Sequence, residues 1–351
     1  MDEIPGLDTE RVSRFLRDHP TFARGPFAFE LISGGRSNLT YRVRCGDRSF
    51  ALRRPPLGHV IATAHDMARE YRVLSALADT AVPVPRPLAL CEDEAVNGAP
   101  FYVMEFCEGV VLQDRVPEGF LATAEDGRRV SRALIDTLVA LHAIDYRAVG
   151  LEGFGRPEGY LERQVRRWAR QWEANRTAPL PEIEALLARL AAALPDSPAP
   201  TIVHGDYRLG NIALAAGDPG RVVAIFDWEM STLGDPLADL GYTLIYWTQA
   251  GEGSEVEATA VTAGPGFHTR DELVAAYAKA SGRDVSAIDF YQVLALTKLA
   301  VISEGIYKRF TLGKTVGEGF AGMRRATAAL AQRALRIADA ADDRRLRGAG
   351  G

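Results

Sequence analysis

The sequence of residues 200–241 is PTIVHGDYRLGNIALAAGDPGRVVAIFDWEMSTLGDPLADLG, and it contains the most informative pattern in the chain. Two apolar runs, residues 201–203 and 222–226, each end in a cluster of polar residues. A Gly-Asp-Pro-Gly sequence at residues 217–220 lies between the two runs and is typical of a turn. The pattern therefore predicts a pair of strands that presents both polar clusters at one edge.

The two polar clusters contain the residue types that metal-assisted phosphoryl transfer needs. Asp206 is followed five residues later by Asn211, and Asp227 follows the second apolar run. In such a reaction one carboxylate orients the acceptor hydroxyl and takes its proton, while amide and carboxylate oxygens hold Mg²⁺ against the nucleotide phosphates. A single Asp or Asn after a strand is usually a turn residue. Three of them in this order favour a catalytic site over isolated turns.

These residues belong to three linked motifs: H-G-D-x-x-x-x-N at 204–211, I-x-D-W-E at 225–229 and G-D-P-x-x-D-L at 234–240. Together the motifs resemble the aminoglycoside phosphotransferase and choline kinase group, which are small-molecule relatives of the protein kinases. Protein kinases carry H-R-D-x-x-x-x-N and D-F-G at the matching places. The resemblance extends over roughly residues 25–330 and is most specific in the central stretch.

The resemblance implies a protein-kinase-like, two-lobed α+β fold. Residues 1–107 would form a nucleotide-binding lobe with an antiparallel sheet and one main helix. Residues 108–340 would form a larger, mostly helical lobe for catalysis and acceptor binding. The charged residues 341–351 are expected to fray into solvent as a flexible tail.

Composition indicates a soluble protein with an acidic balance. The chain has 351 residues, of which 47% are hydrophobic and 25% are charged, and its net charge is -5. An acidic balance argues against a nucleic-acid partner, because such proteins carry an excess of Lys and Arg. The N-terminus has no pattern of a signal peptide and no apolar run is long enough to span a membrane, so we expect a cytoplasmic protein without a membrane partner. Three cysteines are too few and scattered for a disulfide framework.

A phosphate-binding hairpin is expected near the N-terminus. The sequence Gly34-Gly35-Arg36-Ser37-Asn38 separates two β-rich segments, and glycines allow backbone N–H groups to approach a phosphate closely. A Gly-Gly pair also marks ordinary hairpins, so this motif alone is a weak signal. We predict that Gly35, Ser37 and Asn38 contact the nucleotide phosphates.

The strand at residues 50–53 carries an arginine where the resembled kinases carry a lysine. Alternation along a strand places Ala51 and Arg53 on one face, and Glu70 on the next helix is the expected ion-pair partner, the alternative being a solvated glutamate. Arginine is always charged and can bind phosphate through two parallel donors, so the exchange is compatible with nucleotide binding. The surrounding L-R-R-P-P sequence resembles the kinase-like segments attached to some acyl-CoA dehydrogenases.

Two further strands of the N-terminal lobe are predicted, one at residues 88–91 and, after an acidic turn, one at residues 100–106. In the resembled fold such a strand ends at the hinge between the lobes, where backbone groups bind adenine. Glu105 and Cys107 would lie at this hinge, and the lobe boundary would follow near residue 108.

The acceptor site is expected to involve the helix at residues 160–173. Its arginines, Arg163, Arg166, Arg167 and Arg170, recur at helical spacing on one face, beside Trp168. A solvated basic face is the alternative interpretation. Glu229 and Lys298 are further candidate acceptor contacts. An aminoglycoside is a polycation and would need an acidic site, so the basic helix favours an anionic acceptor, with a hydroxyacyl-CoA as the leading candidate.

We therefore expect an ATP-dependent and Mg²⁺-dependent phosphotransferase that phosphorylates a hydroxyl of a small molecule. Asp206 would be the base, Asn211 and Asp227 would bind Mg²⁺, and Arg53 would hold phosphates. Two alternatives stay open: an antibiotic phosphotransferase of the aminoglycoside type, and a catalytically silent nucleotide-binding module that regulates a partner. Arg53 favours the silent module, whereas the retention of all three catalytic and metal-binding residues opposes it. The sequence does not indicate an oligomeric state.

Overall fold

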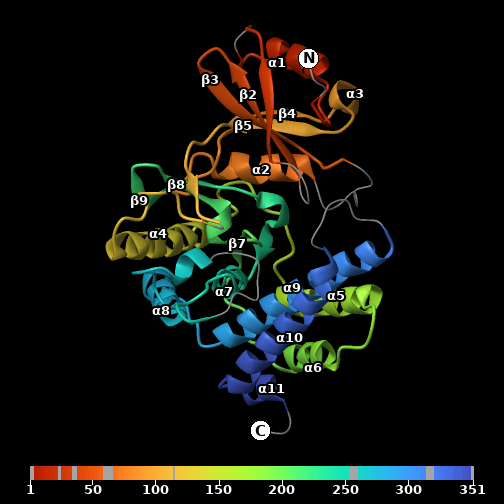
Figure 1. Cartoon of the computed structure of the whole chain (residues 1–351), viewed down its shortest axis with the longest axis vertical. Coiled ribbons are helices and arrows are strands. Elements are labelled where there is room, and N and C mark those ends of the chain that lie inside the picture. Colours follow the sequence, from red (N-terminus) through yellow and green to blue (C-terminus); the bar gives the residue numbers. More distant parts are fainter. Residues whose placement is uncertain are drawn as a thin grey trace.

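The structure of the chain, a computed structural model, describes residues 4–22, 25–33, 38–57, 66–113, 115–252, 260–313 and 320–348. A small N-terminal lobe built on an antiparallel sheet lies above a larger, mostly helical lobe (Figure 1). The two-lobed α+β fold expected from the sequence is therefore confirmed.

The N-terminal lobe is a five-stranded sheet in the order β1-β2-β3-β5-β4, and every neighbouring pair is antiparallel. Its elements are α1 (Thr9–Asp18), β1 (Ala28–Ser33), β2 (Leu39–Cys45), β3 (Arg48–Arg54), α2 (Met67–Leu77), β4 (Pro87–Cys91), α3 (Glu94–Asn97) and β5 (Phe101–Glu105). Helix α1 covers the outer face of the sheet, and α2 lies between the sheet and the larger lobe (Figure 1).

Alternation along β3 separates structural from functional side chains. Phe50 and Leu52 are buried with α1 in a hydrophobic cluster confined to the N-terminal lobe. Ala51 belongs to the other, larger cluster, which also includes Met104 of β5 and the buried face of α2. Because successive side chains of a strand point to opposite faces, Arg53 lies on the side of Ala51, toward the larger lobe, as expected.

The larger lobe combines a helical core with two small sheets that carry the central motifs. Its elements are β6 (Val110–Val111), α4 (Ala124–His142), α5 (Tyr160–Asn175), α6 (Pro181–Ala192), β7 (Thr201–Val203), η1 (Leu209–Asn211), β8 (Ile212–Ala215), β9 (Asp218–Ile225), η2 (Trp228–Met230), β10 (Thr232–Gly234), α7 (Leu237–Ile245), η3 (Ala260–Ala263), α8 (Arg270–Ser281), α9 (Ile288–Thr311), η4 (Phe320–Gly322), α10 (Met323–Ala340) and α11 (Arg344–Arg347), where η marks a short 3₁₀ helix. None of the helices in the described ranges is long and apolar enough to cross a lipid bilayer.

The predicted pairing of the two apolar runs is wrong. Strand β7 pairs with β10, whereas β9 pairs with β8 in a separate sheet that also contains β6. The partners Ala215 and Asp218 leave only two residues for the turn, so β8 and β9 form a tight hairpin. Gly217 therefore lies in the turn between β8 and β9, and residues 218–220 begin β9, so the Gly-Asp-Pro-Gly sequence does not connect β7 to β9.

The structure shows where the predicted lobe boundary and the predicted C-terminal tail lie. The chain leaves the five-stranded sheet after Glu105 and joins the sheet of the larger lobe at Val110, so the predicted boundary after residue 107 falls within this connection. The expected tail differs, because part of it forms α11 and the side chain of Leu346 is only 1% exposed. Asp343 caps this short helix by accepting a hydrogen bond from the N–H of Arg345. The buried side chain of Leu346 thus packs α11 against the larger lobe.

The loop that follows β7 is fixed by Asp239 in the first turn of α7. The buried carboxylate accepts hydrogen bonds from the backbone N–H of His204 at 2.6 Å and of Gly205 at 2.7 Å. Its Oδ2 also lies 3.3 Å from Nε2 of His142, whose Nδ1 contacts the hydroxyl of Tyr277 at 2.8 Å. Burial opposes ionisation, but His142 and the backbone donors hold the pKa of Asp239 below its ordinary value. An ionised Asp239 therefore anchors the loop that precedes Asp206.

The first prediction is that Asp239→Asn lowers the free energy of unfolding by about 1–3 kcal/mol, the usual effect of leaving a buried donor unsatisfied. An asparagine offers one oxygen in place of two and points its own N–H₂ group at backbone donors. Urea unfolding followed by tryptophan fluorescence measures the change, because the tryptophans Trp168, Trp172, Trp228 and Trp247 all lie in the larger lobe.

The matched control is Asp271→Asn, an exposed aspartate in the first turn of α8. Exposed substitutions of this kind usually change stability by less than about 0.5 kcal/mol. Equal stability of the two variants would show that Asp239 does not anchor the loop.

Candidate active site between the lobes

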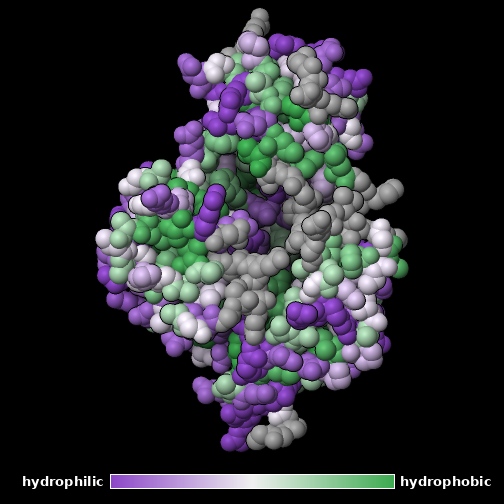
Figure 2. Space-filling view, in the orientation of Figure 1, coloured by the Kyte–Doolittle hydropathy of each residue, from purple (hydrophilic) through white to green (hydrophobic). Residues whose placement is uncertain are grey.

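A cavity of 440 Å³ lies between the two lobes. Figure 2 shows the hollow at this level, with hydrophobic residues above it and hydrophilic residues at its floor. The N-terminal lobe lines the cavity with β3, β5 and the predicted hinge residues Glu105 and Cys107. The larger lobe lines it with Asn211 and with residues 225–228. The volume is in the range of small-molecule and cofactor sites.

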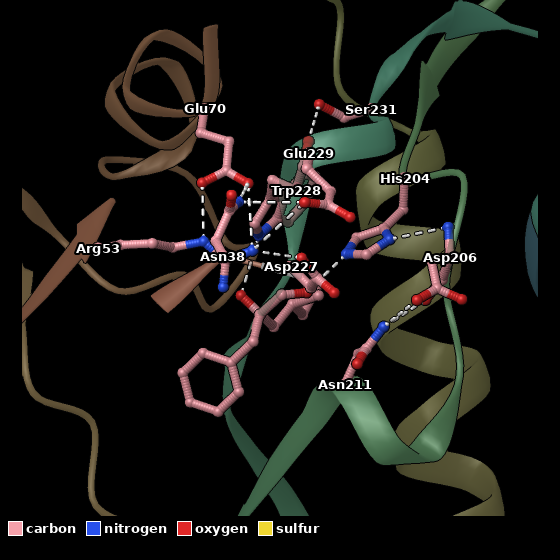
Figure 3. A network of polar contacts seen from close by, with 12 residues as sticks. Asn38, Arg53, Glu70, His204, Asp206, Asn211, Asp227, Trp228, Glu229 and Ser231 are labelled. Carbon is pink, nitrogen blue, oxygen red and sulfur yellow. Dashed lines mark hydrogen bonds and ion pairs between the residues drawn. The ribbon is translucent and has the colours of Figure 1, made fainter. Parts of the chain in front are cut away.

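Asp206 and Asn211 lie side by side in the loop between β7 and β8 (Figure 3). The Nδ2 of Asn211 donates to Oδ2 of Asp206 at 2.7 Å and to the Asp206 backbone oxygen at 2.8 Å. His204 supports the loop by accepting the N–H of Asp206 at Nδ1 and contacting the Phe226 carbonyl through Nε2 at 2.9 Å. This arrangement orients the Asp206 carboxylate and leaves the amide oxygen of Asn211 for another partner.

Asp227 has an unusual backbone conformation. Its φ of 66° and ψ of 60° are left-handed, and it is the single non-glycine residue with positive φ in the part of the chain that the structure describes. This conformation costs a non-glycine residue roughly 1–2 kcal/mol, and such strain is concentrated at functional sites. The turn presents the Asp227 carboxylate to the Nη2 of Arg53, 2.5 Å from its Oδ1.

Arg53 is the centre of a cluster of carboxylates (Figure 3). Its Nε lies 3.0 Å from Oε2 of Glu70, in ion-pair contact without good hydrogen-bond alignment, and its Nη2 lies 3.9 Å from Oε2 of Glu229. The hydroxyl of Tyr102 donates to the same Glu70 oxygen at 2.8 Å. The structure thus contains the Arg53–Glu70 pair expected from the sequence and adds Asp227 and Glu229 to it.

Burial and the crowding of these carboxylates raise the pKa values of Glu229 and Glu70. Burial, then the neighbouring Asp227, raises the pKa of Glu229 to about 8 against the opposing effect of Arg53. Burial also raises the pKa of Glu70, although Arg53 lowers it. The carboxylates of Glu70, Asp227 and Glu229 offer oxygen atoms within 4.8 Å of one another. Oxygen donors at such spacing fit a hard divalent cation such as Mg²⁺, which would favour their ionised forms.

The remaining phosphate-binding candidates are only partly described. Gly35 and Ser37 lie outside the described residues. Asn38 donates from Nδ2 to Glu229 at 3.1 Å and to Glu70 at 3.4 Å. Asn38 and Glu229, predicted to contact phosphate and acceptor respectively, therefore both lie in the carboxylate cluster around Arg53.

The predicted acceptor residues separate into different environments. Arg163 donates to the backbone carbonyls of residues 156 and 158, so its guanidinium supports the start of α5. Arg167 is exposed and its guanidinium lies 5.2 Å from the ring centre of Trp168. Trp168 lines a second, small cavity of 40 Å³ together with Lys298. Only Trp168 and Lys298 of these four residues line this cavity.

Two residues of the site, Tyr102 and Arg208, were not predicted from the sequence. The Nε of Arg208 donates to Oδ1 of Asp206 at 3.3 Å, and Arg208 also lines the cavity between the lobes. A signal was present for both residues. Arg208 lies two positions after Asp206 inside the motif, and Tyr102 shares the inward face of β5 with Met104 by strand alternation.

Comparison with known proteins agrees with this geometry. The chain is 34% identical over 334 residues to acyl-CoA dehydrogenase family member 11 of Gallus gallus, which covers 92% of this chain but 42% of that protein. The chain thus spans about two-fifths of the length of this relative. An aminoglycoside phosphotransferase-like protein from Ralstonia eutropha has a similar structure, with a TM-score of 0.83, 33% identity and coverage of 96% of this chain and 100% of that one.

A more distant structure shows the same fold. An aminoglycoside phosphotransferase solved with AMP-PNP and hygromycin B matches with a TM-score of 0.60 and 15% identity, over 97% of this chain and 99% of that one. Residues 28–273 match the family described as "Phosphotransferase enzyme family". The resemblance expected from the central motifs is confirmed, and the chain belongs to the phosphotransferase enzyme family of the aminoglycoside phosphotransferases.

Proposed function

We propose that the chain transfers the γ-phosphoryl group of ATP to a hydroxyl of a small molecule. The observation that carries this proposal is the convergence of Arg53, Asn211 and Asp227 on one cavity, with Asp206 hydrogen-bonded to Asn211 beside it. The nucleotide in the AMP-PNP complex described above supports ATP as the donor.

The cavity offers distinct surroundings for the parts of a nucleotide. Its apolar side, with Ala51, Met104 and Ile225, suits an adenine ring beside the backbone of residues 105–107. Its polar side contains Arg53, whose guanidinium suits phosphate oxygens. Asn211 and Asp227 would hold Mg²⁺, which would neutralise phosphate charge during transfer.

In this proposal Asp206 acts on the acceptor hydroxyl. Hydrogen bonds from Asn211 and Arg208 occupy one side of each carboxylate oxygen and fix the orientation of the group. In the proposed reaction the hydroxyl oxygen forms a bond to the γ-phosphorus, and its proton passes to Asp206. The bond between that phosphorus and the β–γ bridging oxygen breaks, and ADP leaves with the electron pair.

For the acceptor we propose an anionic hydroxy compound, with a hydroxyacyl-CoA as the leading candidate. The relationship to an acyl-CoA dehydrogenase family member supports this choice, as do the exposed arginines on α5, Arg166, Arg167 and Arg170. An aminoglycoside is the second candidate, favoured by the similarity to the Ralstonia protein. A silent nucleotide-binding module is the third, favoured by the contact of Arg53 with Asp227.

The second prediction is that Asp206→Asn lowers kcat by about 10²–10⁴, the usual contribution of a general base. Binding of Mg·AMP-PNP should change little, because the amide keeps the shape of the carboxylate but does not take the proton. A coupled assay of ADP release with β-hydroxyoctanoyl-CoA measures kcat, and calorimetry measures binding. The exposed Asp145→Asn is the control, and its kcat should equal that of the wild type.

Unchanged turnover in Asp206→Asn would remove this residue from the mechanism. If no transfer occurs in the wild type with hydroxyacyl-CoAs or kanamycin although AMP-PNP binds, the silent module is the better interpretation.

The third prediction concerns Arg53. Arg53→Ala should raise the KM for ATP by about 10-fold to 100-fold, since a charge-assisted hydrogen bond contributes roughly 1.5–3 kcal/mol. Arg53→Lys should show a smaller increase, because a lysine keeps the charge but loses the second parallel donor. Steady-state kinetics at saturating acceptor measure both values.

Arg44→Ala on β2 is the control, since Arg44 is exposed and pairs only with Glu30 among the described residues. Thermal unfolding of each variant tests whether the lobe is intact. A folded Arg53→Ala protein with the wild-type KM for ATP would show that Arg53 does not bind phosphate.

A further inference from the structure

The ammonium of Lys298 lies next to the catalytic loop from the side of α9. Its Nζ donates to the backbone oxygen of Gly205 at 3.0 Å, one residue before Asp206. The same Nζ lies 4.3 Å from the ring centre of Tyr242 on α7. Lys298 does not line the cavity between the lobes, so its ammonium belongs to the part of the site away from the nucleotide.

This ammonium forms no direct ion pair with the residues that the structure describes, although the carboxylates of Asp206 and Asp239 are near enough to oppose the effect of burial on its pKa. It has three N–H donors, and its partners there are one neutral carbonyl and one aromatic ring. Burial lowers the pKa of Lys298 to about 8, so the side chain is still mostly protonated at neutral pH. The Gly205 carbonyl uses one of the three N–H donors, so donors are left that an oxygen atom of a ligand could accept.

A small space for such a ligand adjoins the ammonium. The cavity of 40 Å³ is lined by Lys298, Tyr242 and Gly205, and on its other side by Gln164 and Trp168 of α5. Asp239 also lines it, but hydrogen bonds from the backbone of His204 and Gly205 occupy its carboxylate. This volume is sufficient for one oxygen-bearing group or a water molecule. The face of Tyr242 would attract a ligand cation, but the ammonium of Lys298 already lies over it.

We propose that Lys298 determines acceptor specificity: its ammonium binds a carboxylate or carbonyl oxygen close to the reacting hydroxyl and excludes acceptors that carry an ammonium at that place. This inference rests on the proposed phosphotransferase function and narrows its acceptor. It assigns the positive charge of the acceptor site to Lys298 instead of Arg163, because the guanidinium of Arg163 already donates to backbone carbonyls.

The test is a binding experiment with matched probes on the full chain saturated with Mg·AMP-PNP. The first probe is β-hydroxyoctanoate, and the second is the amino alcohol of the same chain length with an ammonium in place of the carboxylate. The third, β-hydroxyoctanoyl-CoA, presents a neutral carbonyl at the same position and so distinguishes a carbonyl from a carboxylate ligand. The wild type should bind the acid or the thioester at least about tenfold more tightly than the amino alcohol, as expected for a hydrogen bond to a charged group.

Two variants test whether Lys298 causes this preference for the acid or the thioester. Lys298→Met, which keeps the length of the side chain but not its charge, should lose the preference, and Lys298→Arg should keep most of it. The control is Lys308→Met further along α9, where Nζ donates to the backbone oxygen of Ala174 at 2.6 Å. AMP-PNP affinity should be unchanged in all three variants.

Several results would overturn the inference. One is a wild type that shows no preference for the acid or the thioester over the amino alcohol, or that binds none of the probes. Another is a Lys298→Met protein that keeps the preference. A third is a Lys298→Met protein that loses AMP-PNP affinity instead of the preference. If Lys298→Met does not fold, the wild type and Lys298→Arg still decide the question. Transfer from ATP is measured separately, so a preference without any transfer rejects the proposed function and leaves the role of Lys298 in binding intact.

Discussion

A buried carboxylate must obtain from the protein the hydrogen bonds that water would otherwise supply. Asp239 obtains two of them from the backbone of His204 and Gly205, and these bonds fix the loop that carries Asp206. The same carboxylate contacts His142 at the end of α4. Asp239 on α7 therefore joins α4 to the loop after β7, although the three segments are distant in sequence. The position of the candidate base therefore depends on an aspartate that does not itself line the cavity between the lobes.

A second constraint is the balance of charge around Arg53. One guanidinium contacts Glu70, Asp227 and Glu229, so the cluster holds more negative than positive groups. Such an excess is unfavourable in a partly buried site unless a proton or a metal cation offsets it. Burial, and after it the neighbouring Asp227, raises the pKa of Glu229 to about 8. A divalent cation would supply the missing charge, and Arg53 would then be released from Asp227 to meet phosphate.

The arginine also accounts for the geometry of the cluster. A lysine presents a single charged atom, whereas the guanidinium of Arg53 contacts Glu70 through Nε and Asp227 through Nη2. It links α2, which belongs to the N-terminal lobe, with the turn after β9 of the larger lobe. An arginine at this position is thus compatible with an intact site, because it connects the helix that carries Glu70 with the turn that carries Asp227.

How much of this was accessible from the sequence depended on the distance between the interacting residues. The two lobes were implied by the family resemblance of the central motifs. The loop that carries Asp206 and Asn211 followed from the spacing of the motif, and the face of Arg53 followed from strand alternation. The partner of β7 did not, because pairing with β10 depends on tertiary contacts and the competing hairpin of β8 and β9 was not recognised. The approach of Lys298 to Gly205 joins residues 93 positions apart, and no local pattern encodes it.

The most direct test of the account is whether Asp227 couples the nucleotide to Mg²⁺. Calorimetric titration of AMP-PNP with and without Mg²⁺ measures this coupling in the wild type and in Asp227→Ala. We expect Mg²⁺ to tighten binding to the wild type by at least about tenfold, or roughly 1.4 kcal/mol, and to have little effect on the variant, because a methyl group cannot ligate a cation that requires oxygen donors. An equal effect of Mg²⁺ on both proteins would contradict the proposed metal site and, with it, the assignment of the cavity.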